Sequence, residues 1–420
     1  FYRLTIVNNY LDEERRACLL LVIARILGDS RHNRSIETVK SQATCSEDLF
    51  VHLERIFSLG GIWPTKSSYV RFTICIVYFS FYLIMAYADF LEVFGNLELM
   101  VMNLVESMVY TITFSMVWVI RCNKLLKRII TMAKQDIAAH EFENAEEERI
   151  YYAYNSMSKI FFQVSTTGML VTVSFLYFRP LLRFSTTSVN ATELFILPLR
   201  VRTFFGLTNM RSYVLMYVYL APMMYMSVCH MTAICALVIL IFHICGKLSI
   251  LSYRIRNIEV NSKGSADNRI RGLVEMHLKI LWMAKSLDDT FHIILLDELL
   301  GNSIVLAISM YYVLLNFDIA ALATCFTFTF FAFTALLMLY GYCLIGEQLT
   351  QQSINVQDAY YHCNWQEMSR NSKRSVLICM TRAQVLLYLT AGKFYIFSLN
   401  GFTDVVKTSL AYLSMLRTVL

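Results

Sequence analysis

Apolar residues occur along this chain in long uninterrupted blocks rather than at the short spacings of a soluble helix or strand. A helix that crosses a bilayer needs about 20 mostly apolar residues. Seven runs are about this long. An eighth, Val376–Leu389, has only fourteen residues and carries Arg382 and Gln384, so it predicts a short buried helix. The pattern therefore predicts an all-α membrane protein with seven transmembrane helices. They are expected at residues 72–92, 99–120, 160–178, 213–245, 293–315, 319–345 and 397–416.

The composition agrees with a membrane protein. Of 420 residues, 57% are hydrophobic and only 16% are charged, and the mean hydropathy is +0.50. A soluble domain is about 45–50% apolar and about 25% charged. With 14 glycines and 4 prolines, the chain also differs from disordered and collagen-like proteins. An outer-membrane barrel is disfavoured too, because its alternating strands average to a modest hydropathy.

The distribution of positive charge predicts the orientation. Thirty of the 37 Lys and Arg residues lie before the first span and in the polar segments 121–159, 247–290 and 346–393. These segments share one side of a seven-helix chain, and cytoplasmic segments carry the excess of Lys and Arg. We therefore expect a cytosolic N-terminus and an extracellular C-terminus, which is the inverse of a G-protein-coupled receptor.

Other features also disfavour that receptor class. The last two spans contain no proline, no Asp-Arg-Tyr follows the third span, and the expected external loop 179–212 has no cysteine for a disulfide. Asn190 begins an Asn-Ala-Thr glycosylation motif in that loop, which agrees with the predicted orientation.

Patterns for catalysis or metal binding are not found. Gly246-Lys247 and Gly392-Lys393 lack the upstream glycine of a phosphate loop. Ser303 has no nucleophile elbow, and the eight histidines lack the spacing of metal ligands. We therefore predict neither an enzyme nor a bound cofactor or metal.

Polar residues inside the spans are candidates for function, because they are costly in hydrocarbon. Glu106 lies in the second span with Asn103 and Ser107 beside it. Asp404 and Lys407 stand three apart in the last span and are expected to pair with each other. Matched halves and broken helices, which a proton-coupled transporter would show, are not visible.

The C-terminal third carries a specific resemblance. It contains QDAYYHCNW at 357–365, a basic turn at Arg370–Arg374, a short helix, and LTAGKFYIFSLNGFTDVVKTSLAYLSMLR at 389–417. This order is similar to the end of insect odorant receptors, and in style to the hymenopteran members. The segment DLFVHLERIFSLGGIWP at 48–64 also resembles their N-termini. The last-helix pattern of gustatory receptors is not reproduced, and residues 1–40 match nothing in either family.

The resemblance implies an odorant receptor subunit of a ligand-gated, non-selective cation channel. Such a subunit binds small hydrophobic volatiles and forms a heterotetramer with a shared coreceptor in the plasma membrane of an olfactory dendrite. It would divide the chain into a cytosolic N-terminal segment (1–66), six helices with the ligand pocket (67–345), a cytosolic anchor (346–396) and a pore-lining helix (397–420). The anchor would include the polar loops 246–290 and 346–375. A seven-helix chemoreceptor, gustatory-like or G-protein-coupled, and a transporter without its own pore stay open as alternatives.

The resemblance also implies positions for ligand and gate. The ligand pocket would lie in the outer halves of the second, third, fourth and sixth helices, and Met415 would stand where the family often carries an apolar valine at the gate, with Leu416 as its neighbour. The expected pocket residues are Asn103, Ser107, Thr172, Phe175, Met216, Tyr217, Leu220, Phe326 and Phe330. The expected pore residues are Thr408, Ala411, Met415, Leu416 and Thr418.

Overall fold

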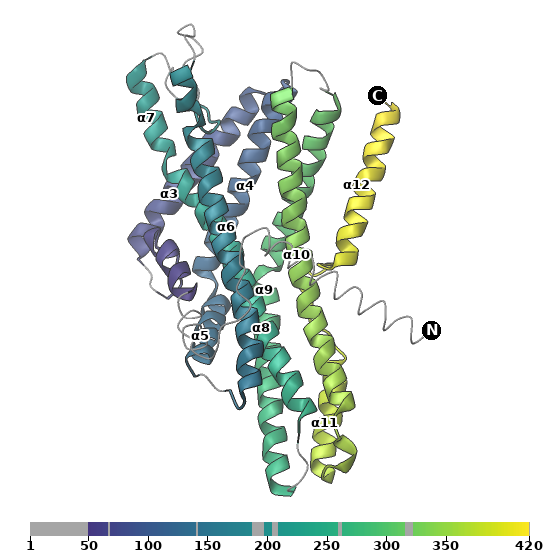
Figure 1. Ribbon diagram of the computed structural model, residues 1–420. Helices are drawn as coiled ribbons and strands as arrows, with labels where there is room; N and C mark the ends of the chain where they lie inside the picture. The colour runs from purple at the N-terminus through teal and green to yellow at the C-terminus, as the bar shows by residue number, and fades with distance from the viewer. Residues whose placement is uncertain are drawn as a thin grey trace. The chain divides into compact units, whose positions relative to one another are not determined.

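Helices form nearly all of the regular structure in this computed structural model (Figure 1). The structure describes residues 49–65, 68–139, 142–186, 197–203, 209–258, 263–315 and 322–419, all within the compact unit Glu47–Leu420. After a helical stretch at 49–59 come α3 (Tyr69–Glu92), α4 (Leu97–Cys122), α5 (Lys124–Ala139), α6 (Ala145–Thr186), α7 (Met210–Leu220), α8 (Pro222–Arg256), α9 (Lys263–Leu315) and α10 (Leu322–His362). The chain continues with the 3-10 turn η2 (Trp365–Glu367), α11 (Arg370–Ala383), β1 (Thr390–Ala391), β2 (Tyr395–Ile396) and α12 (Leu399–Val419).

The described parts of the seven predicted crossings lie in α3, α4, α6, α7 with α8, α9, α10 and α12. Within the described part of the chain, six helical stretches are long and apolar enough to cross a membrane: Tyr69–Glu92, Met102–Cys122, Ala145–Phe178, Met210–Arg256, Asp267–Val313 and Phe328–His362. The seventh, α12, has 21 residues, or about 32 Å of helix at 1.5 Å per residue. The predicted all-α fold is confirmed.

The polar segments expected to be loops are largely helical, and this expectation was wrong. Segment 121–159 contains α5 and the first turns of α6, while 246–290 and 346–375 are mostly extensions of α8, α9 and α10. The apolar blocks mark only the part of each helix that can lie in hydrocarbon. A helix of 53 residues such as α9 is about 80 Å long, well beyond the roughly 30 Å of a bilayer core.

Helix α8 is the centre of the bundle. Every residue from Cys229 to Gly246 is buried, and α8 packs against α4, α6, α9 and α10 (Figure 1). A helix that is apolar on all sides is expected to be enclosed by other helices. Pro222 stands in the first turn of α8, where a missing backbone N–H costs least, and it separates α8 from α7.

The short helix before α12 begins and ends earlier than predicted. It was expected at Val376–Leu389, after a basic turn, but α11 runs from Arg370 to Ala383 and includes that turn. The side chain of Ser369 accepts a hydrogen bond from the Ser372 backbone N–H (3.2 Å) and so caps the N-terminus of the helix. Residues after Gln384 instead lead into a small antiparallel hairpin in which Thr390 pairs with Ile396 and Ala391 with Tyr395.

Candidate functional site

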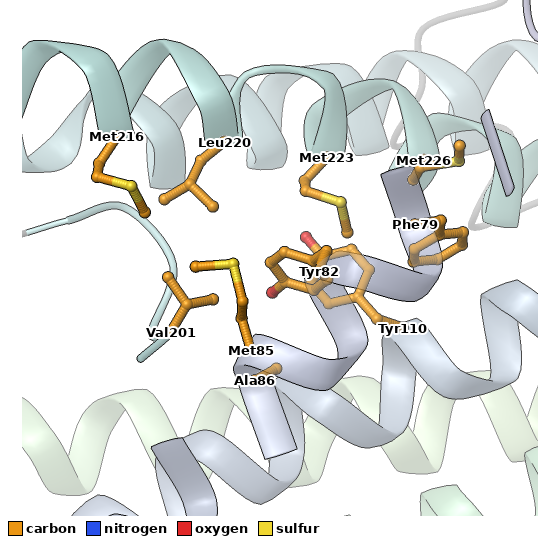
Figure 2. Close-up of a cluster of buried hydrophobic side chains, with 10 residues drawn as sticks. All are labelled: Phe79, Tyr82, Met85, Ala86, Tyr110, Val201, Met216, Leu220, Met223 and Met226. Carbon is orange, nitrogen blue, oxygen red and sulfur yellow. The ribbon is translucent and has the colours of Figure 1, made fainter. Parts of the chain in front are cut away.

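Ten buried side chains from α3, α4, α7, α8 and one loop pack together, and we call them the methionine cluster. Figure 2 shows the thioethers of Met85 and Met223 beside the ring of Tyr82, with Met216 and Leu220 further along the cluster. Methionine is flexible and polarisable, and it packs favourably against aromatic rings. The members are Phe79, Tyr82, Met85, Ala86, Tyr110, Val201, Met216, Leu220, Met223 and Met226.

The segment 197–203, which we call the strap, packs against the methionine cluster. Val201 is a buried member of the cluster, and Leu197 and Leu199 pack against it. The backbone N–H of Arg202 donates to the carbonyl of Met85 (3.2 Å). The strap is therefore attached to α3 by apolar contacts and by a backbone hydrogen bond.

Arg200 adds polar bonds that hold the strap to two helices. Its Nε donates to Asp89 Oδ2 on α3 (2.9 Å), and its backbone N–H donates to Glu106 Oε2 on α4 (3.1 Å). Asn103 Nδ2 donates to the same Asp89 oxygen (2.9 Å), and Ser107 Oγ donates to Asn103 Oδ1 (3.0 Å). Asn103 and Ser107, predicted to line a ligand pocket, are thus buried members of a hydrogen-bond network next to the methionine cluster.

Two other predicted pocket residues, Met216 and Leu220, belong to the methionine cluster itself. Tyr217 lies in a separate group of tyrosines between α6 and α7. Its ring centroid is 4.7 Å from that of Tyr177, and the hydroxyl of each donates to the backbone carbonyl of the other. The sequence signal for this group was the pair of tyrosines at 213 and 217, one helical turn apart, but their partner Tyr177 on α6 could not be predicted from it.

The remaining predicted pocket residues lie elsewhere on the bundle. Thr172 and Phe175 on α6, and Phe326 and Phe330 on α10, are exposed in the single chain. Phe328, between the latter two, is fully buried, with its ring centroid 4.2 Å from that of Tyr312 on α9. The structure therefore does not gather the nine predicted residues at one point, and their part in ligand binding stays a prediction.

A second buried polar group connects three helices in the middle of the bundle. His230 Nε2 on α8 lies 3.3 Å from Glu298 Oε1 on α9, and His230 Nδ1 lies 3.1 Å from Thr113 Oγ1 on α4. Asn302 Nδ2 donates to the other oxygen of Glu298 (3.1 Å). Since α9 begins 35 residues before Glu298, at Lys263, this carboxylate lies well inside the helix.

Outside the spans, Asp136 on α5 forms an ion pair with Lys279 on α9. Its carboxylate also lies 3.8 Å from Nε2 of His243 on α8. Burial alone would raise the pKa of this carboxyl. The His243 ring and the positive charges of Lys279 and Lys247 outweigh burial and lower the pKa of Asp136 to about 2. Asp136 thus stays ionised and holds α5 against α8 and α9.

The predicted pore residues lie on α12. Thr408, Ala411 and Met415 are exposed in the single chain, while the side chains of Leu416 and Thr418 lie outside the described residues. Asp404 and Lys407 are both described and exposed, and they do not form the expected ion pair. Asn190 and residues 1–40 lie outside the described residues as well. Among the residues that the structure does describe, no group of three His, Cys, Asp or Glu could hold a metal ion.

The sequence profile of the 7tm Odorant receptor family matches residues 96–410, from the N-cap of α4 into α12. The chain belongs to the seven-transmembrane odorant receptor family. It is therefore a member of a receptor family and not of an enzyme family, as the sequence predicted.

Similar odorant receptors include Odorant receptor 13a of Drosophila melanogaster, which is 27% identical over 49% of this chain and 53% of its own length. The odorant receptor coreceptor of the same insect is 26% identical over 35% of this chain and 30% of its own length. The chain thus matches about half, or less, of the length of these curated relatives.

Solved odorant receptor structures share the fold over most of the chain. The insect olfactory receptor OR5 from Machilis hrabei superposes with a TM-score of 0.72 at 13% identity, covering 89% of this chain and 100% of that one. The same receptor in complex with eugenol gives a TM-score of 0.70 at 14% identity, with the same coverage. At this identity the likeness shows the fold alone.

Proposed function

We propose that this chain is an odorant-tuned subunit of a ligand-gated, non-selective cation channel. The observation that carries the proposal is the family match over residues 96–410, together with the seven-helix fold that the chain shares with an insect olfactory receptor. The subunit would join a coreceptor in a heterotetramer in the plasma membrane, to which each subunit contributes α12 as a pore helix. The similarity to coreceptors of several insects supports a common assembly.

The ligands we propose are small hydrophobic volatiles. Support comes from the buried thioether and aromatic side chains where α3, α4, α7 and α8 meet, because such surfaces attract apolar molecules by dispersion and shape. The family's pocket positions on α4, α6, α7 and α10 stay the proposed binding residues. Met216 and Leu220 are common to both sets, and they are therefore the first positions to vary.

The orientation that we propose has the N-terminus in the cytosol and the C-terminus outside. Its support is the bias of Lys and Arg toward one side. The strap would then lie at the outer side, and α5, α11 and the hairpin at the cytosolic side. A tag at the N-terminus should be reached by antibody only after permeabilisation, and a tag after Leu420 on intact cells.

The test of the function is a current recording. The chain is expressed in oocytes with an insect coreceptor and exposed to a panel of aliphatic esters, alcohols and phenols that includes eugenol. We expect at least one compound to evoke a cation current that the coreceptor alone does not give. A receptor that reaches the surface but acts only through a G protein, or that takes up a compound without current, would instead support the seven-helix chemoreceptor or the transporter.

A further inference from the structure

The hairpin between α11 and α12 turns through two residues in the left-handed region. Gly392 has φ +60° and Lys393 has φ +67°. Lys393 is the one described non-glycine residue with a positive φ, and L side chains adopt this conformation only at a cost. Surrounding contacts must therefore hold Lys393 in place.

Those contacts come from one stretch of α9. Lys393 Nζ lies 2.5 Å from Asp288 Oδ2 and 2.6 Å from Asp289 Oδ1. The second oxygen of Asp288 accepts hydrogen bonds from the backbone N–H (2.9 Å) and the hydroxyl (2.7 Å) of Thr390. We call this set of Lys393, Thr390, Asp288 and Asp289 the clamp.

A backbone bond and a charge effect strengthen the clamp. The Gly392 N–H donates to the carbonyl of His292, one turn further along α9 (2.8 Å). Burial alone would lower the pKa of Lys393, but the two carboxylates raise it above its ordinary value. Lys393 therefore stays charged at every cytosolic pH, and charge-assisted hydrogen bonds are the stronger kind.

The clamp lies close to the first turn of α12. Phe397 is buried, and its N–H donates to the carbonyl of Leu389 (3.0 Å) across the hairpin. The N–H of Leu399, the first residue of α12, donates to Glu347 Oε2 on α10 (3.2 Å). The start of α12 is thus bonded to α10 directly and to α9 through the hairpin, and α12 also packs against α9.

Helix α9 in turn connects the clamp to the centre of the bundle. Glu298, ten residues after Asp288, lies against His230 of α8 (3.3 Å). A shift of α9 against α8 therefore has a continuous route of contacts, along α9 and through the hairpin, to the first turn of α12.

We propose that Lys393 is a positioning residue that couples α9 to the pore helix α12 through Asp288 and Asp289. The proposal rests on the proposed function, in which α12 lines the pore. Ligand binding that shifts α9 moves the hairpin with it and so changes the position of α12. Without the clamp, the hairpin keeps its backbone bond from Gly392 to His292 but loses its charged attachment, so α12 follows α9 less closely.

The first experiment tests the attachment itself and needs no ligand. Backbone hydrogen exchange is measured by mass spectrometry on purified full-length receptor in detergent, for the wild type, Lys393→Gln, Lys393→Arg and the control Lys285→Gln. Lys285 is an exposed lysine on α9. We expect Lys393→Gln to speed exchange in peptides covering 390–402, while Lys393→Arg and Lys285→Gln leave it unchanged. Unchanged exchange in Lys393→Gln would overturn the proposal.

The second experiment tests the coupling, in oocytes that also express an insect coreceptor. The strongest agonist from the odorant panel is applied to the wild type and the same variants. We expect Lys393→Gln to raise the half-activating concentration about tenfold, with single-channel conductance unchanged and with near-normal responses in Lys393→Arg. A lower maximal current at an unchanged half-activating concentration and unchanged surface amount would mean that Lys393 only maintains structure.

Asp289 provides the matched partner test, because it pairs with Lys393 without holding Thr390, which Asp288 does. If the two residues act as one unit, the double variant Lys393→Gln with Asp289→Asn should have nearly the same half-activating concentration as Lys393→Gln, within about twofold. Additive effects would overturn the coupling through this pair. A wild type that reaches the surface but gives no current to any compound would defeat the proposed function, and hydrogen exchange would still decide whether the clamp holds α12.

Discussion

Gly346 on α10 faces the backbone carbonyl of Phe397 so closely that a Cβ at this glycine would collide with the carbonyl oxygen. Phe397 is fully buried and comes two residues before α12. A rigid backbone atom cannot give way as the end of a flexible side chain can. The start of α12 is therefore packed against α10 with no room for a side chain between them.

We predict that Gly346→Ala disturbs the start of α12. Alanine normally favours a helix interior over glycine by about 1 kcal/mol, but at Gly346 the collision with Phe397 must displace the hairpin. We expect a lower unfolding temperature in detergent and a smaller agonist-evoked current. Both are measured on receptor matched for surface amount.

Gly341, on the same helix, is the control for that change. Nothing lies within 4 Å of a Cβ built at Gly341, so Gly341→Ala should keep or slightly raise the unfolding temperature. Equal effects of the two substitutions would show that the contact with Phe397 does not constrain α12.

A second prediction concerns the strap. Arg200→Ala leaves Asp89 without its cationic partner, and unpaired buried charges are costly, so we expect a loss of about 2 kcal/mol in stability. Arg202 is the control, since its pair with Glu92 is half exposed (54% and 59%) and such pairs contribute less than about 1 kcal/mol. Chemical denaturation in detergent, with the odorant dose–response alongside, distinguishes the two. A larger loss for Arg202→Ala would contradict the strap's attachment through Arg200.

A third prediction follows from the lowered pKa of Asp136. In the unfolded chain an aspartate titrates near pH 4, and in the folded chain at about 2. The stabilisation from this group is therefore complete above about pH 4 and is lost as the pH falls from 4 toward 2.

Asp136→Asn should accordingly lower the unfolding temperature at pH 6, and its difference from the wild type should shrink on acidification to about pH 3. The exposed Asp358 provides a control, because Asp358→Asn should change little at either pH. A difference that stays constant with pH would show that Asp136 is not held ionised by its neighbours.

The sequence located the membrane crossings but not the full lengths of the helices, and the reason is physical. Hydrocarbon imposes a length and an apolar composition on each crossing, so the crossings could be located, including α12. The bilayer does not impose this on the parts of the helices that extend beyond it. The polar turns that extend α9 back to Lys263 therefore resembled loops.

The candidate site was less predictable. Asn103 and Ser107 could be singled out as polar residues in a span, but their network depends on Asp89 and Arg200, which are 111 residues apart in the chain. In the first half of α10 the sequence is apolar on all sides and gives no helical periodicity. It therefore did not indicate that Phe328, rather than Phe326 or Phe330, turns inward.

A fourth prediction uses that difference in orientation. Phe328→Ala removes a fully buried ring that packs against the ring of Tyr312, and should cost about 3 kcal/mol of stability. Phe326 is 74% exposed in the single chain, and Phe326→Ala should cost little. Unfolding in detergent measures both. If Phe326→Ala changes the odorant profile without changing stability, Phe326 contacts the ligand or another subunit.

The last prediction concerns the gate. Thr408, Ala411 and Met415 are spaced by three and four residues and therefore share one face of α12. A ring of apolar side chains on this face can stop ions by dewetting, and methionine is flexible enough to withdraw when the helices separate. We expect a charged thiol reagent applied from outside to alter the agonist-evoked current of Met415→Cys.

Leu410 provides the matched control. It is exposed to a similar degree (56%, against 65% for Met415) but lies five residues away, about 140° around the helix. The same reagent should leave the currents of Leu410→Cys and of the wild type unchanged. Modification of Leu410→Cys but not of Met415→Cys would mean that α12 turns its other face to the ions, and unmodified currents in both would remove the outer half of α12 from the conduction path.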